Sequence, residues 1–230
     1  MKNSLKNLGI FIILFFIFLY KDIFYLIPLK VLNINFDTLS YNMQIFLSIC
    51  SSLILVIIFI IIYYKYLKEK FIEYKKNISN FLDLGLKYYL VGLFGMFIFN
   101  ILIMLFSPVK EANNEVLVQE MLKKAPILSF ISASILAPFL EEMLFRKSFG
   151  DIFKNKKIMV IASGLFFGFL HVIFSIKTPW DLLYIIPYGM LGGGFAYTLY
   201  KKDNIFIPIT FHFLHNSILI ILSILLTVIS

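Results

Sequence analysis

Apolar residues fall into seven long runs, separated by short connections rich in polar and basic residues. Each run approaches the roughly 20 residues that an α-helix needs to cross the hydrocarbon core of a bilayer. The pattern therefore predicts an all-α, polytopic membrane helix bundle that forms a single integral membrane domain over residues 1–230. The runs are residues 8–28, 43–64, 87–107, 126–147, 158–175, 181–200 and 205–228.

The number of spans is expected to be about seven, with six or eight also compatible with the pattern. The first run is interrupted by Lys21 and Asp22, which predicts a kink or a partly interfacial segment. The last run contains His212, His215 and Asn216 and is the other place where a helix can break.

Composition supports a membrane protein and argues against a nucleic-acid-binding protein. The chain is 60% hydrophobic, which is more apolar surface than a soluble domain of this size can bury. Its net charge of +8 would suggest nucleic acid in a soluble protein, but here we expect no nucleic-acid partner and contact with anionic lipid of the bilayer instead. The one cysteine, Cys50, excludes an internal disulfide and a CxxC metal site.

Basic residues indicate the orientation in the cell membrane. They concentrate at the N-terminus and in residues 65–86, 146–157 and 201–202, and they alternate with connections poorer in Lys and Arg. The positive-inside rule then predicts a cytoplasmic N-terminus and an extracytoplasmic C-terminus. Residues 113–125 can form an amphipathic helix on the outer surface, and residues 65–82 can lie on the inner surface, although either can be an ordinary connector.

Several polar side chains lie where a membrane makes them costly. An ionisable group at mid-bilayer costs roughly 2.5–3.5 kcal/mol on insertion scales, so such groups usually have a function. Glu141, Glu142 and Arg146 close the fourth run. All three histidines of the chain, His171, His212 and His215, also lie within apolar runs.

The spacing of these residues predicts shared helix faces. Glu142 and Arg146 are four residues apart and can pair, which would fix the helix end, while Glu141 is rotated by about 100° and stays available. His212 and Asn216 are also four residues apart. At about 1.5 Å of rise per residue from the basic ends, the groups reach overlapping depths. We therefore expect one polar cavity, on the cytoplasmic side.

Such a cavity suits hydrolysis of a peptide bond. Glu141, poorly hydrated, would be a better proton acceptor and could deprotonate a water molecule with help from His171. His212 and Asn216 could then donate N–H groups to the developing oxyanion. One mechanistic alternative is a zinc-dependent metalloprotease with Glu141, His171 and His212 as ligands.

Three short motifs resemble a known family. EEMLFR at 141–146 fits E-E-x-x-x-R, FGFLH at 167–171 fits F-x-x-x-H, and HFLHN at 212–216 fits H-x-x-x-N. In this order on successive membrane helices, they resemble the CAAX-protease and bacteriocin-processing (Abi) family of intramembrane proteases, which includes the type II CAAX prenyl endopeptidase. The resemblance covers residues 126–220, which would form the catalytic core.

The resemblance implies roles for six residues and a class of substrate. Glu141 would be the water-activating base assisted by His171, His212 and Asn216 would stabilise the oxyanion, and Glu142 with Arg146 would support the site. The substrate would be a small or membrane-associated peptide or a membrane protein, and no cofactor would be needed. Bacterial members of the family are linked to peptide maturation, bacteriocin processing and self-immunity.

Other interpretations remain open beside this one. The chain can be a non-catalytic immunity or partner-binding protein that uses the same cavity. A proton-coupled transporter is disfavoured by the absence of an inverted repeat. His215 is an additional histidine that can assist or make a structural hydrogen bond. Gly164 and Gly168, together with Gly189 and Gly192–Gly194, predict close helix packing and not phosphate binding.

Overall fold

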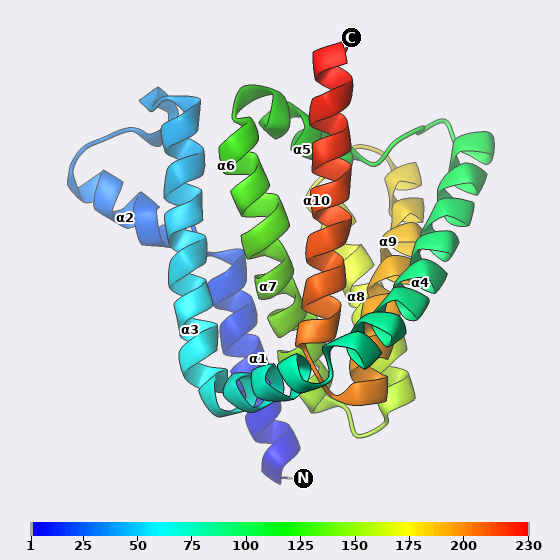
Figure 1. The fold of residues 1–230 in the computed structure, drawn as a ribbon. Coiled ribbons are helices and arrows are strands. Elements are labelled where there is room, and N and C mark those ends of the chain that lie inside the picture. The colour runs from blue at the N-terminus through cyan, green and yellow to red at the C-terminus, as the bar shows by residue number, and fades with distance from the viewer. Residues whose placement is uncertain (1, 230) are drawn as a thin grey trace.

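The computed structural model describes residues 2–229, with the side chains of residues 5–226, and every regular element in that part of the chain is helical (Figure 1). This confirms the all-α prediction. Short turns of other helix types occupy Phe36–Thr38, Ile131–Leu136, Glu142–Ser148, Gly150–Ile152 and Pro179–Tyr184. The α-helices are α1 (Lys2–Leu19), α2 (Ile23–Val31), α3 (Tyr41–Lys76), α4 (Ile78–Phe106), α5 (Asn113–Lys124), α6 (Pro126–Phe130), α7 (Ala137–Glu141), α8 (Lys156–Ile173), α9 (Ile185–Lys202) and α10 (Phe206–Ile229).

Six helical segments within the described residues are long and apolar enough to span a membrane: Tyr41–Lys76, Ile78–Phe106, Pro126–Ile152, Lys156–Ile173, Pro179–Lys202 and Phe206–Leu226. A seventh arises if Leu5–Leu19 and Ile23–Val31, which meet at an angle of 51°, are one broken span. The break falls at Lys21 and Asp22, where the sequence predicts a kink, and α2 leans away from the bundle (Figure 1). The protein is therefore a multi-pass membrane protein.

The predicted basic connections gather at one end of the bundle (Figure 1). The N-terminus, the α3–α4 joint, the connection before α8 and the α9–α10 turn all lie there, whereas α5 and the C-terminus lie at the opposite end. Helix α3 continues beyond the expected boundary at 64, with a non-helical break at Tyr63. Beyond that break the chain runs across the basic end, as the inner-surface interpretation of residues 65–82 expects.

The span from Pro126 to Ile152 contains two wide, π-type segments, and the second begins between the two adjacent acids. Glu141 is the last residue of α7, and Glu142 begins a wide, π-type segment whose end has the N–H of Phe149 donating to the carbonyl of Leu144, 2.9 Å away. Wide turns of this kind are rare and occur frequently at functional sites. Because the helical geometry changes here, the carboxylates of Glu141 and Glu142 lie in different surroundings.

Close packing of α8 against α9 depends on glycine, as predicted. A Cβ added at Gly164 would lie 2.7 Å from the carbonyl oxygen of Gly189, and one at Gly168 would strike the carbonyl oxygen of Ile185. A Cβ at Gly192 would lie 2.8 Å from the ring of Phe167. Gly193 is the exception, because a Cβ there would meet no atom within 4 Å. Close packing therefore does not explain Gly193.

Candidate active site

Glu142 is the centre of a buried polar network that joins three spans through Arg146, His212 and Gly192. Its Oε2 atom lies 3.1 Å from Nε of Arg146, and its Oε1 atom lies 2.8 Å from Nδ1 of His212. The side chains of Glu142 and Arg146 are wholly buried. Arg146 also donates from a terminal nitrogen to the carbonyl of Gly192 at 3.2 Å and lies 4.4 Å from the ring centroid of Phe167. The wide segment thus keeps the predicted Glu142–Arg146 pair.

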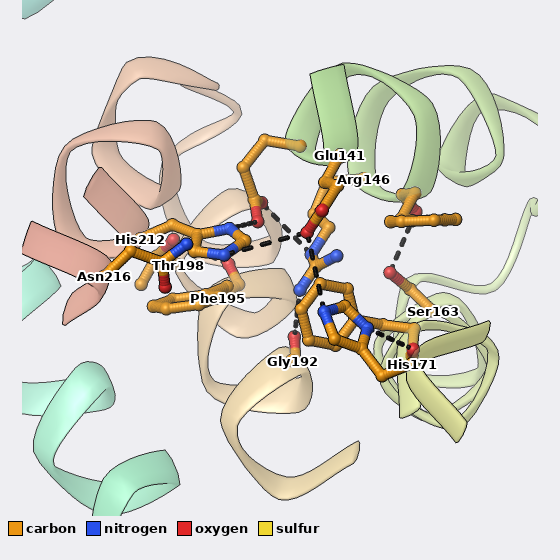
Figure 2. A network of polar contacts seen from close by, with 12 residues as sticks. Glu141, Arg146, Ser163, His171, Gly192, Phe195, Thr198, His212 and Asn216 are labelled. Carbon is orange, nitrogen blue, oxygen red and sulfur yellow. Dashed lines mark hydrogen bonds and ion pairs between the residues drawn. The ribbon is translucent and has the colours of Figure 1, made fainter. Parts of the chain in front are cut away.

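Glu141 lies beside this network but has different partners. Its Oε2 atom is 3.8 Å from Nε2 of His171 and 3.7 Å from Nε2 of His212, both beyond direct hydrogen-bond distance. Figure 2 shows Glu141 between the two imidazole rings. This oxygen is buried, yet it has no hydrogen-bond partner among the described residues. A buried carboxylate oxygen ordinarily finds one, and water is the usual partner when the protein supplies none.

The hydrogen bonds on the far side of each ring set which nitrogen carries the proton. Nδ1 of His171 is 2.9 Å from the carbonyl of Phe167, which can only accept, so Nδ1 of His171 is the donor. Nδ1 of His212 likewise donates to Glu142, because a carboxylate paired with arginine accepts. In the neutral rings both Nε2 atoms therefore carry a lone pair, and both lie near Glu141.

Asn216 and His215 complete the polar lining from α10. Nδ2 of Asn216 donates to the carbonyl of Ala133 at 2.8 Å, which leaves the second N–H of the amide and its oxygen for other partners. Nδ1 of His215 lies 3.2 Å from the hydroxyl of Tyr89 on α4. Both residues line the same cavity as Glu141. The additional histidine therefore makes a side-chain hydrogen bond and reaches the site.

The structure brings together all six residues singled out from the sequence, in two layers. Glu141, His171, His212 and Asn216 line a cavity of about 200 Å³, and Glu142 with Arg146 lies behind its wall. The carboxylate and the imidazoles thus face open space, while the supporting ion pair is removed from it. This division matches the separate roles that the spacing of Glu141 and Glu142 predicts.

The cavity runs toward α5, at the end of the bundle away from the basic connections. Its lining extends along α10 to Ser223 and includes Glu115 and Gln119 of α5. The sequence instead predicts a cavity on the side of the basic connections, and the lining residues favour the other side. Helix α5 closes this end, and Nε2 of Gln119 donates to Oγ of Ser223 at 2.9 Å.

Helix α5 is amphipathic, as predicted, and only part of its apolar face is buried. Leu122 is buried, whereas Leu117 is 51% exposed. The residues that reach the cavity are largely polar, because the helix covers the site and not only the bundle surface. A second groove, of about 460 Å³, shares Met96, Glu115, Tyr188 and Leu219 with the cavity and reaches the α4–α5 connection.

The arrangement bears on the zinc alternative. Within the described residues, no group of three or more His, Cys, Asp or Glu side chains is arranged to hold a metal ion. The two Nε2 atoms and Glu141 are nevertheless nitrogen and oxygen donors that zinc accepts, and each Nδ1 has the kind of hydrogen bond that orients a metal ligand. Metal dependence therefore stays a question for experiment.

Sequence reasoning missed the face of α9 that holds the rings in place. Tyr188 stacks on His171 with 4.9 Å between ring centroids, and Phe195 stacks on His212 at 5.0 Å. Gly192, between them, accepts the hydrogen bond from Arg146. The spacing of these three α9 residues, by four and then three positions, places them on one helical face, and this signal was available in the sequence.

Part of the chain is similar to a known family of proteins. Residues 123–218 match the family described as type II CAAX prenyl endopeptidase Rce1-like. These residues, which contain all three motifs, are therefore similar to the Rce1-like family. No solved structure matches the chain.

Curated relatives match between 40% and 55% of the chain. A protein of Bacillus subtilis (strain 168) named "Putative membrane peptidase YdiL" is 27% identical over 116 residues, which is 49% of this chain and 44% of the relative. From Lactococcus lactis subsp. lactis (strain IL1403), UPF0177 protein YaiF is 30% identical over 40% of this chain and 39% of its own length. UPF0177 protein YvdC is 27% identical over 55% of this chain and 49% of its own length. The matches thus span less than half of each of these relatives.

Proposed function

We propose that this protein is an intramembrane endopeptidase that cleaves small or membrane-associated peptides, or membrane proteins, with a water molecule activated by Glu141. The observation that carries the proposal is the buried Oε2 atom of Glu141, which has no hydrogen-bond partner among the described residues and lies within 4 Å of two imidazole nitrogens. This position suits a water molecule that donates its two hydrogens to Glu141 and His171 and opens onto the cavity. The family match supports a peptidase of the CAAX type.

In the proposed reaction, Glu141 accepts a proton from the water molecule as its oxygen forms a bond to the scissile carbonyl carbon. Nε2 of His171, with its lone pair toward the cavity, accepts the other hydrogen of the water and orients it. Glu141 then passes the acquired proton to the nitrogen of the leaving amine as the C–N bond breaks. The products are a carboxylic acid and an amine, and Glu141 is regenerated.

The oxyanion formed in this step needs donors. Asn216 has a second amide N–H, because Ala133 occupies only one. His212 can donate from Nε2 when that nitrogen is protonated, since Nδ1 already donates to Glu142. The adjacent Glu142 carboxylate stabilises the positive charge that the ring then carries. The role expected for His212 from the sequence thus depends on Glu142.

We further propose that the basic end of the bundle faces the cytoplasm and that the cavity opens on the opposite side. Support comes from the clustering of the basic connections at one end and from the α5 residues that line the cavity. A peptide would reach Glu141 through the groove that adjoins the cavity between α4 and α9. This reverses the cytoplasmic access expected from the sequence.

A peptide pool tests the proposed activity. The purified full chain in lipid vesicles is incubated with a pool of synthetic amphipathic peptides, and cleavage is read by mass spectrometry. Glu141→Gln, which keeps the shape of the side chain, should lower cleavage by roughly 10²–10⁴-fold. Glu120→Gln, at an exposed position of α5, is the control and should leave cleavage unchanged. Equal cleavage by wild type and Glu141→Gln would refute the mechanism.

Two further arms separate the alternatives. Cleavage that survives a zinc chelator supports the metal-free mechanism, and cleavage lost on chelation and restored by zinc supports the metalloprotease. A cellular immunity phenotype that persists in Glu141→Gln would point to the non-catalytic, partner-binding function.

A further inference from the structure

Another groove lies on the lipid-facing side of the bundle, apart from the candidate active site and from the groove that adjoins it. It is a groove of about 420 Å³ between α4, α8 and α9, and it shares no lining residue with the 200 Å³ cavity. Its lining contains no charged residue and consists of aliphatic side chains, one methionine, five glycines and two tyrosines. Val91 and Ile161 on its walls are 59% and 64% exposed. In a membrane, such a surface contacts hydrocarbon.

Gly193 keeps this groove open. Gly92, Gly164 and Gly194 also line it, but an added Cβ on each would come within 3.0 Å of backbone on a neighbouring helix. A Cβ on Gly193 would meet nothing within 4 Å, so its missing side chain serves no helix contact. The absence of a side chain at Gly193 therefore leaves the groove open and is not required for contact between helices.

Lysines surround one end of the groove, one from each of its three helices. Lys87 precedes Val91 by four residues, Lys157 precedes Ile161 by four, and Lys201 follows Tyr197 by four. Residues with this spacing share a helical face, so each lysine lies one turn beyond a lining residue. Lys157 and Lys201 lie at the ends of α8 and α9 that belong to the basic end of the bundle, and Lys87 lies in the first part of α4, which begins there (Figure 1).

All three lysines are exposed, and two of them lie close to the groove's tyrosines. Nζ of Lys201 lies 5.3 Å from the ring centroid of Tyr197, and Nζ of Lys87 lies 5.6 Å from that of Tyr88. Among the described residues, none of the three lysines at the groove is within ion-pair distance of a carboxylate. The acids nearest in sequence are Asp83, one turn before Lys87, and Asp203, which pairs with Lys70 at 3.4 Å.

We propose that this groove is a binding site for one anionic glycerophospholipid, with an acyl chain in the groove beside Gly193 and the phosphate among Lys87, Lys157 and Lys201. The groove accepts only apolar material, and its rim offers positive charge at the level where lipid headgroups lie. Tyrosine is favoured at this interface, where its ring can be buried and its hydroxyl hydrated. A second transmembrane helix would fill the groove but would leave the three lysines without a counter-charge.

Native mass spectrometry of the full chain tests the site. The protein is reconstituted with equimolar phosphatidylglycerol and phosphatidylcholine, and the lipid that remains bound is identified. Wild type should keep one phosphatidylglycerol in preference to phosphatidylcholine. Gly193→Leu, which fills the groove from an unobstructed position, should lose this lipid, and Gly193→Ala should lose part of it. Gly9→Leu is the matched control, because a Cβ at Gly9 also meets nothing within 4 Å and Gly9 does not line the groove.

Lysine variants separate the headgroup from the acyl chain. Lys87→Gln with Lys201→Gln should keep a bound lipid but lose the preference for phosphatidylglycerol, at about fivefold for each charge removed. Lys65→Gln with Lys68→Gln, at exposed positions of α3, should keep it. Glycerol phosphate added free in solution should not compete, because it lacks the acyl chain.

Three results would overturn the lipid site. They are equal retention of the two lipids by wild type, unchanged retention in Gly193→Leu, and a lipid-independent dimer that Gly193→Leu dissociates. The last of these would assign the groove to a second copy of the chain.

Discussion

Nδ1 of His212 donates a hydrogen bond to Oε1 of Glu142 over 2.8 Å, and the other oxygen of the same carboxylate pairs with Arg146. Glu142 therefore connects α10 to the span that carries both acids, and it holds a ring of the candidate site from behind. A supporting group of this kind fixes which nitrogen of the imidazole faces the substrate. The second acid of the EE pair is thus as important to the geometry as the first.

Glu142→Gln should destabilise the protein, whereas Glu141→Gln should not. The amide leaves the wholly buried Arg146 without a counter-charge, and breaking a buried ion pair in this way costs about 3–5 kcal/mol. Glu141 is partly exposed to the cavity and makes no direct hydrogen bond to lose. Thermal unfolding in detergent should show a large fall in midpoint only for Glu142→Gln. Equal midpoints would mean that the Glu142–Arg146 pair does not stabilise the fold.

Asn216→Ala should slow cleavage more than it weakens substrate binding. If its free amide N–H donates to the oxyanion, losing it removes an interaction made in the transition state, which costs roughly 10²–10³-fold in kcat. KM should change little. Ser217→Ala, at the next position of α10, is the control, since the Ser217 hydroxyl is buried and does not line the cavity. A loss seen mainly in KM would instead assign Asn216 to substrate binding.

The sequence alone was enough to predict the apolar spans and to single out the six polar residues, because both depend on residues that are close together in the chain. Membrane length fixes the size of each apolar run, and helical spacing fixes which residues share a face. Charge within such runs is costly, so Glu141, His171 and His212 stood out without any alignment. The family match over residues 123–218 contains all of these positions.

The features that the sequence did not predict depend on how segments that are far apart in the chain pack against one another. The wide helical turn that begins at Glu142 has no local marker in the sequence, so it appears only in three dimensions. The stacking of Tyr188 on His171 depends on α9 packing beside α8, and that of Phe195 on His212 depends on α9 packing beside α10. The sequence did not predict that α5 lines the cavity. Its amphipathic pattern is that of a helix on the membrane surface, and a helix that covers a polar site has the same pattern.

The direction in which the cavity opens can be measured in intact cells. In a Cys50→Ser background, one cysteine is placed at Glu111, beside the groove, and another at Lys75, at the basic end. With the N-terminus in the cytoplasm, a membrane-impermeant maleimide should label Glu111→Cys in intact cells and Lys75→Cys only after permeabilisation. The reverse pattern would restore the cytoplasmic access expected from the sequence.

Two adjacent glycines of α9 provide a comparison of packing and open space. A Cβ at Gly192 would lie 2.8 Å from Phe167 and 3.1 Å from a terminal nitrogen of Arg146, so Gly192→Ala should displace the guanidinium that pairs with Glu142. Overpacking of this kind costs about 1–3 kcal/mol. Gly193→Ala meets nothing within 4 Å and should be neutral, or stabilising by up to about 1 kcal/mol through helix propensity.

Thermal midpoints of the two variants, measured in the same detergent, test this contrast, and cleavage should fall with stability only for Gly192→Ala. Equal midpoints would mean that α8 and α9 can separate enough to accept a methyl group. The Arg146 network would then be more tolerant of displacement than its complete burial implies.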